Sequence, residues 1–196
     1  MTVGDILEAN IELARHKDVV AIHSLAQQRS LSNRSTTEDH QGGFLVSNFT
    51  PDDYHRYVDL AEHFFVARDA EKIIGFVLSF LCDQNSSLEW LESSSADVLG
   101  DMALIKQICV SKDHAGSGIG TDLYSYLFQQ MPHKTIVASV VDEPPNVASA
   151  RFHSKLGFHP YFTYTPSDEF ERTVWRRLPG GMDRRLPRMA RYGLPS

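Results

Sequence analysis

The sequence has few cysteines and no long apolar run, and both absences narrow the class of protein. Only two of the 196 residues are cysteine, Cys82 and Cys109, and each lies in an apolar stretch typical of a strand. A disulfide framework is therefore excluded, and no His, Cys and Asp cluster has the spacing of a metal site, so we expect no metal. The longest apolar run, residues 73–82, is too short to span a bilayer. Because no basic or apolar leader precedes it, we expect a cytoplasmic protein with no membrane partner.

Basic residues are scarce in most of the chain. Residues 1–170 contain 12 lysines and arginines against 23 aspartates and glutamates, and the net charge of the whole chain is −6. An acidic body argues against a nucleic-acid partner and favours a cationic acceptor. Residues 171–196 reverse this balance, with seven arginines against Glu171 and Asp183. We expect one domain over residues 1–178 and a basic, partly disordered tail over residues 179–196.

The apolar pattern alternates between the periods of strands and helices. Strands predicted at 102–110 and 135–141 flank a helix at 121–131, which makes this pair parallel. Predicted hairpins, one turning at 69–72 and one joining 158–164 to 170–177, make the remaining strands antiparallel. The fold class is therefore α/β with a mixed, mainly antiparallel sheet. Further expectations are a weak strand at 11–15, a helix at 18–28 capped by Asp18, a helix starting at Thr50, a helical turn within 83–100, a helix at 146–157, and burial of Leu123, Tyr126 and Leu127.

The stretch SKDHAGSGIG, residues 111–120, joins a predicted strand to a predicted helix. Such a loop presents unpaired backbone N–H groups and the positive end of the helix dipole, and glycines let phosphate oxygens approach that backbone. It is compatible with a phosphate or diphosphate cradle, and equally with a tight turn. Gly116, Gly118 and Gly120 form G-x-G-x-G, which is not the spacing of the dinucleotide fingerprint, and no P-loop lysine follows.

A second motif, NVASARFHSKLGF, covers residues 146–158. At about 100° per residue, Asn146, Ser149 and His153 share one narrow sector of a helix. The neighbouring sector is apolar, so the helix packs along that side. The polar sector fits either a ligand contact or a solvated surface, and the spacing alone leaves both open.

Together the two segments resemble the GCN5-related N-acetyltransferase (GNAT) superfamily. ICVSKDHAGSGIGTDLYSYL is similar to its strand, diphosphate loop and helix, and NVASARFHSKLGF is similar to its Asn-led helix ending in LGF. Within the superfamily, PPNVAS and FHSKLGF look most like a group of bacterial predicted acetyltransferases of unassigned substrate. The resemblance covers about residues 10–178 and implies a sheet whose parallel pair is splayed, with acetyl-CoA as cosubstrate in the cleft.

The resemblance also implies which residues hold the cosubstrate. Backbone groups of Ile108, Cys109 and Val110 would align the pantetheine arm and polarise the acetyl carbonyl. Two residues depart from the family pattern: Ala115 replaces the usual Arg or Gln, and His153 replaces the tyrosine near the sulfur. We expect weaker binding from the first, and a histidine general acid from the second, unless His153 is an ordinary helix-surface residue. The remaining expected contacts are Ala115, Gly116, Ser117, Gly118, Ile119, Gly120, Thr121, Asn146, Ser149 and His153.

The general base is less defined by the sequence. A lysine-like amine with a pKa of about 10.4 is neutral in only about one molecule in 2,500 at pH 7, so a base or a desolvated site is required. Glu143 is the preferred candidate because it follows the strand at 135–141 and precedes two prolines. Asp142, Asp101 and a water chain to solvent are alternatives. Asp39 and His40 lie in a segment expected to line the acceptor pocket, or are ordinary loop residues.

The leading hypothesis is an enzyme that acetylates a primary amine of a small molecule or peptide by direct attack in a ternary complex. A homodimer is compatible with the resemblance. The alternative, from another functional class, is a catalytically silent acyl-CoA-binding or sensor module, because Ala115 and His153 are both changes that a degenerate enzyme could carry. A carboxylate facing the thioester would separate the two hypotheses.

Overall fold

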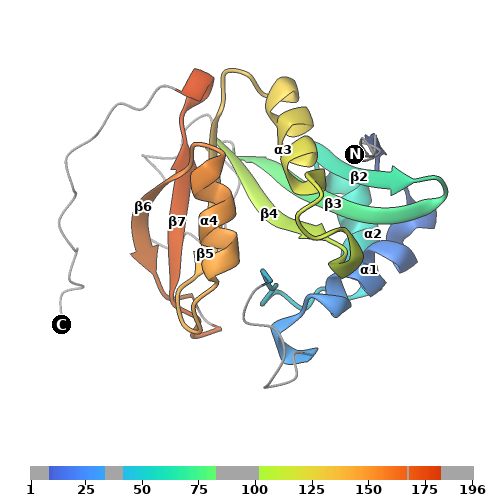
Figure 1. The fold of residues 1–196 in the computed structure, drawn as a ribbon, viewed down its shortest axis with the longest axis horizontal. Coiled ribbons are helices and arrows are strands. Elements are labelled where there is room, and N and C mark those ends of the chain that lie inside the picture. The colour runs from blue at the N-terminus through green and yellow to red at the C-terminus, as the bar shows by residue number, and fades with distance from the viewer. Residues whose placement is uncertain (1–8, 34–41, 83–101, 167, 182–196) are drawn as a thin grey trace, which may run out of the picture.

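The computed structural model describes residues 9–33, 42–82, 102–166 and 168–181, and these contain a seven-stranded sheet. The strand order is β1-β2-β3-β4-β5-β7-β6 (Figure 1). Every neighbouring pair is antiparallel except β4 and β5, which run parallel. The strands are β1 Asn10–Leu13, β2 His63–Asp69, β3 Lys72–Cys82, β4 Met102–Val110, β5 Thr135–Val141, β6 His159–Tyr164 and β7 Arg172–Arg177.

Helices cover both faces of the sheet. They are α1 Val19–Gln28, α2 Pro51–Leu60, α3 Ile119–Gln130 and α4 Val147–Lys155. Helices α1 and α2 bury Ile22 and Tyr54 against Phe76 of β3 on one face, and α3 buries Leu123 against Ile74 of β3 on the other. Strand β3 is consequently apolar along nearly its whole length, since both faces are covered. Helix α4 lies beside α3 (Figure 1), in front of the half of the sheet formed by β5, β6 and β7.

The fold class predicted from the sequence is confirmed, and several predicted elements match their observed limits. The strands at 102–110 and 135–141 occur as predicted and form the parallel pair. Both hairpins are present. Helix α2 begins as its sequence indicates: the Thr50 hydroxyl accepts from the Asp53 N–H at 3.2 Å, and the Asp53 carboxylate accepts from the Thr50 N–H at 2.9 Å.

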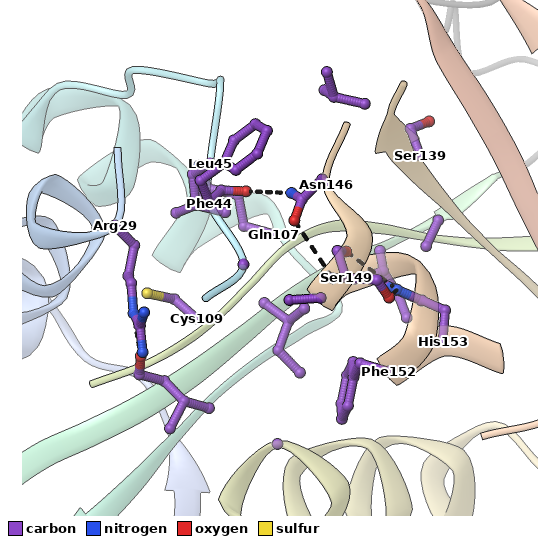
Figure 2. Close-up of a pocket in the computed structure, with 18 of the residues that line it drawn as sticks. Arg29, Phe44, Leu45, Gln107, Cys109, Ser139, Asn146, Ser149, Phe152 and His153 are labelled. Atoms are coloured by element: carbon purple, nitrogen blue, oxygen red, sulfur yellow. Dashed lines mark hydrogen bonds between the residues drawn. The ribbon is translucent and has the colours of Figure 1, made fainter. Parts of the chain in front are cut away.

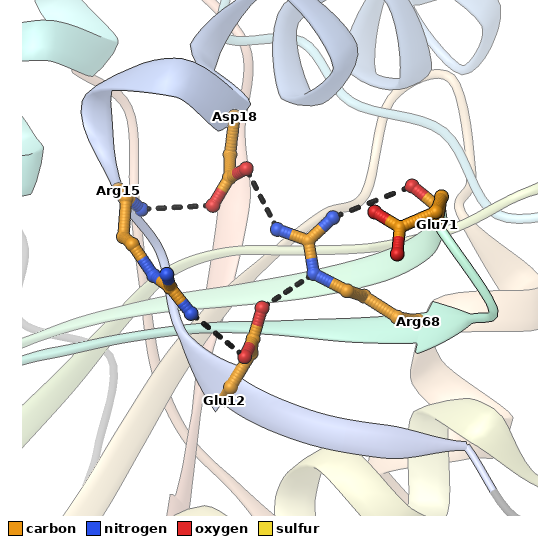
Figure 3. Close-up of polar contacts among 5 residues, drawn as sticks. All are labelled: Glu12, Arg15, Asp18, Arg68 and Glu71. Carbon is orange, nitrogen blue, oxygen red and sulfur yellow. Dashed lines mark hydrogen bonds and ion pairs between the residues drawn. The ribbon is translucent and has the colours of Figure 1, made fainter.

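Two local predictions are wrong. Asp18 precedes α1 but makes no side-chain cap there. Its carboxylate instead accepts from the Arg15 N–H and pairs with Arg68 of β2 (Figure 3), so a tertiary ion pair takes the oxygen that a cap would use. In α3 the fully buried tyrosine is Tyr124, on the same face as Leu123 and Leu127, whereas Tyr126 is only half-buried and packs at the edge of that core.

Other expectations fall partly or wholly outside the described residues. The helical turn within 83–100 and the basic tail from residue 182 onward belong to this group. Residues Pro179–Gly181 form a short 3-10 turn after β7. The division between domain and tail therefore stays a prediction.

Candidate acyl-CoA site between strands β4 and β5

The parallel pair separates part of the way along its length. Strand β4 pairs with β5 only from Met102 to Ile105, opposite Thr135–Ala138. Beyond this point β4 continues its ladder with β3, and β5 continues with β7. A bulge lies at the same place: Ser79 pairs with Ile105 and Leu78 with Gln107, so Lys106 is the extra residue. Because a bulge bends its strand, it accounts for β4 turning away from β5 (Figure 1).

A cavity of about 650 Å³ fills the space between the separated strands. Its walls come from the far half of β4, the glycine loop, the N-terminal part of α4 and the segment 42–47. A further wall is formed by residues of β5 and of the β6–β7 connection: Ala138, Ser139, Val141, Tyr164, Pro166, Asp168 and Arg172. Figure 2 shows residues of β4, α4 and the segment 42–47 around this space, with Arg29 and His153 on opposite sides. Of the predicted cosubstrate contacts, Ile108, Cys109, Val110, Ala115, Gly116, Gly118, Ile119, Gly120, Thr121, Asn146, Ser149 and His153 line it, and Ser117 does not.

The three glycines of the loop have different structural roles. Gly116 has φ 79° and Gly118 has φ 97°, which is the left-handed region where glycine is favoured, and a Cβ on either would meet nothing within 4 Å. Gly118 is the N-cap of α3 and no side chain caps this helix, so its first N–H groups have no side-chain partner. A Cβ on Gly120 would instead lie 3.1 Å from the Phe152 ring. The first two glycines thus shape an open cradle for an anion, and the third lets α4 approach α3.

Ser117, predicted as a contact, turns its hydroxyl back into the loop. Its Oγ donates to the His114 carbonyl at 2.7 Å. His114 in turn approaches the Ser111 hydroxyl through Nδ1, at 2.7 Å. These bonds hold the loop's shape from within.

Asn146 connects two walls of the cavity. Its Nδ2 donates to the Phe44 carbonyl at 2.9 Å, and its Oδ1 accepts from the Ser149 N–H at 3.4 Å at the start of α4 (Figure 2). The side chain is 6% exposed. Both ends of the amide are therefore engaged within the protein, which accounts for an asparagine at this N-cap and fastens the segment 42–47 to α4.

His153 is buried and does not carry the proton that a general acid would donate. Its Nδ1 lies 2.8 Å from the Ser149 carbonyl, which can only accept, so Nδ1 is protonated and Nε2 accepts from the Tyr124 hydroxyl at 2.8 Å. Burial lowers the pKa of His153 to about 4. The expectation of a partly protonated histidine at neutral pH is therefore wrong, because the charged form would lose its hydration without gaining a carboxylate.

Tyr124 is one of the residues of this site that the sequence analysis missed. It is fully buried, and burial raises the pKa of its hydroxyl well above the ordinary value. Its ring packs against Phe152 and Phe158. The helical period does indicate it, since Tyr124 lies one turn before Leu127 on the buried face of α3.

The predicted base, Glu143, lies outside the cavity. It is exposed in the turn after β5 and is not among the lining residues. Asp142 accepts from the Thr173 hydroxyl at 2.7 Å and also lies outside this cavity. Asp39, His40 and Asp101 fall outside the described residues.

The sheet also places a thiol beside the cavity. Cys109 donates to the Leu25 carbonyl of α1 at 3.6 Å, and burial raises the pKa of its thiol to about 12. A thiol with this pKa is not ionised at neutral pH, so Cys109 serves as a small packing residue. Cys82 is likewise a free, buried thiol.

Two further classes of site are not found. Within the described ranges, no three His, Cys, Asp or Glu side chains gather in a way that could hold a metal ion. Among these same residues, no helix has both the length and the apolar character needed to cross a membrane.

Solved structures share this architecture at low sequence identity. Ard1 from Thermoplasma volcanium superposes with a TM-score of 0.63 and 18% identity, covering 87% of this chain and 97% of that chain. The ribosomal-protein-S18-alanine N-acetyltransferase from Escherichia coli has a TM-score of 0.59 and 16% identity, covering 89% and 95%. NAA60 from Arabidopsis thaliana, solved in complex with acetyl-CoA, has a TM-score of 0.64 and 12% identity, covering 87% and 99%. These likenesses establish the fold.

Family membership comes from the sequence itself. Among proteins of curated function, none matches this chain significantly. The model of the acetyltransferase (GNAT) family, however, matches residues 18–158, which is more than half of the chain and contains the separated strands, the glycine loop and α4. The match confirms the resemblance carried by the two motifs, and the chain therefore belongs to the acetyltransferase (GNAT) family.

Proposed function

We propose that this protein is an N-acetyltransferase that binds acetyl-CoA in the cavity between β4 and β5 and transfers the acetyl group to a primary amine. The observation that carries the proposal is the coincidence of three features at one cavity. Pairing of β4 with β5 ends at Ile105, a bulge lies at Lys106, and the glycine loop follows the same strand. Membership of the family supports the assignment of the cosubstrate.

In this proposal the cosubstrate lies along β4. The backbone of Gly116 and Gly118 and the first turn of α3 receive the diphosphate, where helix N–H groups and the dipole favour negative charge. The pantetheine amides follow Ile108–Val110, where the strand has left β5 and its edge faces the cavity. The thioester then lies near the bulge, where the two strands part.

The reaction is direct attack in a ternary complex. The neutral amine attacks the thioester carbonyl carbon, the C–N bond forms, the C–S bond breaks, and coenzyme A leaves as a thiolate. The amine nitrogen loses a proton and the thiolate gains one. If the thiolate's pKa is near the cysteine value of about 8.5, its departure needs far less assistance than deprotonation of a lysine-like ammonium, with a pKa of about 10.4.

We assign His153 a positioning role in place of general acid catalysis. Its two nitrogens are engaged by Ser149 and Tyr124, and it is 3% exposed. The bond to Tyr124 joins α4 to α3 beside the contact between Gly120 and Phe152. The pair therefore fixes the distance between the two helices that frame the diphosphate cradle.

A catalytically silent acyl-CoA-binding module is the second candidate, and one observation favours it. Among the described lining residues, Asp168 is the one carboxylate, and it is tied to Arg172 in an ion pair. The low pKa of His153 removes the other obvious proton carrier. A protein of this kind would keep the cavity and bind the thioester without turnover.

Release of the coenzyme A thiol in the presence of primary amines tests the proposal. We expect thiol release that depends on both the amine and acetyl-CoA, and saturable acetyl-CoA binding by calorimetry. Binding without amine-dependent release across peptides, amino acids, polyamines and aminoglycosides would favour the silent module. Absence of acetyl-CoA binding would overturn both candidates.

A further inference from the structure

A buried amide on the cavity wall has an unused hydrogen-bond donor. Gln107 of β4 is 3% exposed, and it is among the residues that line the cavity (Figure 2). Its Oε1 accepts from the Tyr54 hydroxyl at 2.7 Å, and its Nε2 donates to the Ser47 carbonyl at 3.3 Å. The side chain therefore joins β4 to α2 and to the segment 42–47.

These two partners fix the orientation of the amide. Burial raises the pKa of the Tyr54 hydroxyl, so this hydroxyl keeps its proton and donates it to the amide oxygen. The Ser47 carbonyl can only accept, so it requires the NH2 group. A flipped amide would bring Oε1 against the Ser47 carbonyl, and two acceptors would then face each other. Since Gln107 and Ser47 both line the cavity, the nitrogen between them lies at the cavity wall.

A glutamine nitrogen has two N–H donors, and the protein uses one of them. Among the described residues, Ser47 is the one acceptor bonded to Nε2 of Gln107. A buried donor without a partner destabilises a protein, and most buried polar groups are therefore paired. The second N–H of Gln107 is consequently available to an acceptor atom of a molecule bound in the cavity.

The position of Gln107 along β4 indicates which part of the cosubstrate it would meet. Pairing of β4 with β5 ends at Ile105, and Gln107 follows the bulged residue Lys106. The glycine loop begins at Ser111, four residues beyond Gln107, which is about 13 Å along a strand. The diphosphate is therefore out of reach of the Gln107 amide, whereas the thioester of the proposed function lies beside it.

The chemistry of the thioester indicates which atom would accept this hydrogen bond. Its carbonyl oxygen is a good acceptor and gains negative charge as the amine attacks, whereas its sulfur is a weak acceptor. The amine nitrogen is a poor candidate, because a hydrogen bond to its lone pair would withhold that pair from the carbonyl carbon. A donor that is oriented before the reaction stabilises a developing oxyanion strongly in a buried site.

We infer that Gln107 is a further catalytic residue, whose second N–H donates to the acyl carbonyl oxygen of the bound thioester and stabilises the oxyanion formed during attack. Tyr54 and Ser47 are positioning residues that hold the amide in this orientation. The inference rests on the proposed function and adds a side-chain donor to the backbone groups of β4. As the C–N bond forms, the carbonyl π electrons move to the oxygen, and they return when the C–S bond breaks. Gln107 neither gains nor loses a proton.

Comparison of acetyl-CoA with coenzyme A tests this contact without an acceptor amine. Only acetyl-CoA has the acyl carbonyl. Gln107→Met keeps the length of the side chain and removes both donors, so it should raise Kd for acetyl-CoA about fivefold and leave Kd for coenzyme A unchanged. Calorimetry measures both constants. Equal effects on the two ligands, including no effect on either, would overturn the inference, because the amide would then support the cavity or contact the pantetheine arm.

The infrared stretch of the thioester carbonyl reports the hydrogen bond directly. A hydrogen bond to the oxygen weakens the C=O bond, so acetyl-CoA labelled with ¹³C at this carbon should absorb at lower frequency in the unsubstituted protein than in Gln107→Met. Tyr54→Phe keeps the ring and releases Oε1, so it should give an intermediate frequency and serves as the second variant if Gln107→Met does not fold. The same frequency in every protein that folds would overturn the inference.

Turnover with a primary amine separates an effect on the oxyanion from an effect on the amine. Gln107→Met should lower kcat about 100-fold and change KM for the amine by less than about twofold. Gln130→Met, which replaces an exposed glutamine of α3 outside the cavity, is the control. Gln107→Glu, which offers no donor when ionised, should also be slow. Faster turnover in Gln107→Glu would show that position 107 acts on the amine and would overturn the inference.

Failure of the inference can be distinguished from failure of the proposed function. If the unsubstituted protein binds acetyl-CoA but acetylates no amine, the transferase proposal fails, and the carbonyl contact is still decided by the two Kd values and the infrared frequency. If amines are acetylated and Gln107→Met retains full kcat, the transferase proposal holds and the inference fails. Absence of acetyl-CoA binding would overturn both.

Discussion

At the scale of single residues, the site depends on its glycines, which have no side chain, as much as on the residues that have one. Gly118 adopts φ 97° at the start of α3 and leaves open space above the backbone. Gly120, two residues later, has ordinary helical geometry but no room for a Cβ beside Phe152. The two glycines therefore disfavour substitution for different reasons, and their variants should respond differently to a change at position 152.

Alanine substitutions separate these reasons. Gly118→Ala should lower the free energy of unfolding by about 1–2 kcal/mol, because alanine is strained in the left-handed region. Gly120→Ala should cost about 1 kcal/mol through contact with the Phe152 ring. Urea denaturation of each, alone and combined with Phe152→Leu, measures the difference. Phe152→Leu should restore part of the stability lost in Gly120→Ala, because it removes the ring that the new methyl group contacts. If Phe152→Leu restored the stability of Gly118→Ala instead, this explanation would be contradicted.

The second residue-scale prediction concerns the pH dependence that His153 gives to stability. Its pKa is about 4 in the folded protein and about 6.5 when unfolded, so the unfolded chain binds the extra proton between these values. The free energy of unfolding should therefore be unaffected by His153 above pH 7 and fall as the pH drops below 6.5. Between pH 7.5 and pH 5 this loss is about 2 kcal/mol.

Comparison with His153→Gln isolates that contribution. Glutamine does not titrate, so the variant should lose about 2 kcal/mol less than the unsubstituted protein over the same interval. Chemical denaturation at pH 7.5, 6.5 and 5.0 measures both curves. Parallel curves for the two proteins would mean that His153 is accessible to protons in the folded state.

At the scale of secondary-structure elements, an ion-pair network fixes where α1 enters the fold. Arg68 of β2 binds Glu12 of β1 at 2.5 Å and Asp18 at 2.6 Å, and Asp18 also accepts from the Arg15 N–H (Figure 3). Asp18 is 4% exposed. The guanidinium thus joins the first two strands to the turn before α1, and the C-cap of α1, Arg29, lies on the cavity wall.

Removing the arginine should leave a buried charge without its partner. Arg68→Met should lower the free energy of unfolding by about 3 kcal/mol, because Asp18 would stay buried without a compensating cation. Arg15→Gln is the matched control: Arg15 pairs with the same Glu12, but its side chain is 56% exposed, so its loss should cost less than about 0.5 kcal/mol. Urea denaturation measures both, and equal losses would show that Asp18 reaches water.

At the scale of the whole molecule, the distribution of charge matters more than its sum. Arg29 and Lys155 lie at the glycine-loop end of the cavity, while the chain carries an excess of acidic residues. At ordinary salt concentrations, charges more than about 10 Å apart are largely screened. An anionic cosubstrate therefore responds to the cavity and not to the net charge of −6.

Salt titration shows whether acetyl-CoA binding responds to the local charge of the cavity or to the net charge of the protein. Raising NaCl from 0.05 to 0.5 M should weaken acetyl-CoA binding by roughly fivefold, because local attraction is screened. Lys155→Gln should reduce this dependence, and the control Lys17→Gln, which removes an exposed lysine outside the cavity, should not. Calorimetry measures Kd in each case. Tighter binding at high salt would mean that repulsion by the acidic surface dominates.

Much of the architecture can be predicted from the sequence because strands, turns and caps are encoded locally. The strands 102–110 and 135–141, the cap at Thr50 and the glycine loop follow from residues within a few positions of one another. The N-cap position of Asn146 is of the same kind. The family follows from these motifs, since they combine local structure with their order along the chain.

The chemistry of the site was decided by tertiary contacts. The pKa of His153 is lowered by burial. Its hydrogen-bond partner Tyr124 is 29 residues away, and the Asn146 amide is bound to Phe44, 102 residues away. Glu143 lies in the turn between Val141 and Asn146, which both line the cavity, but it is not itself among the lining residues. The charge state of a buried group depends on which other groups surround it in the low-dielectric interior. Spacing along the sequence predicts only the neighbours within one helix or strand. The motifs therefore determined the fold and family, whereas packing between distant segments determined the burial of His153 and the partners of Asn146.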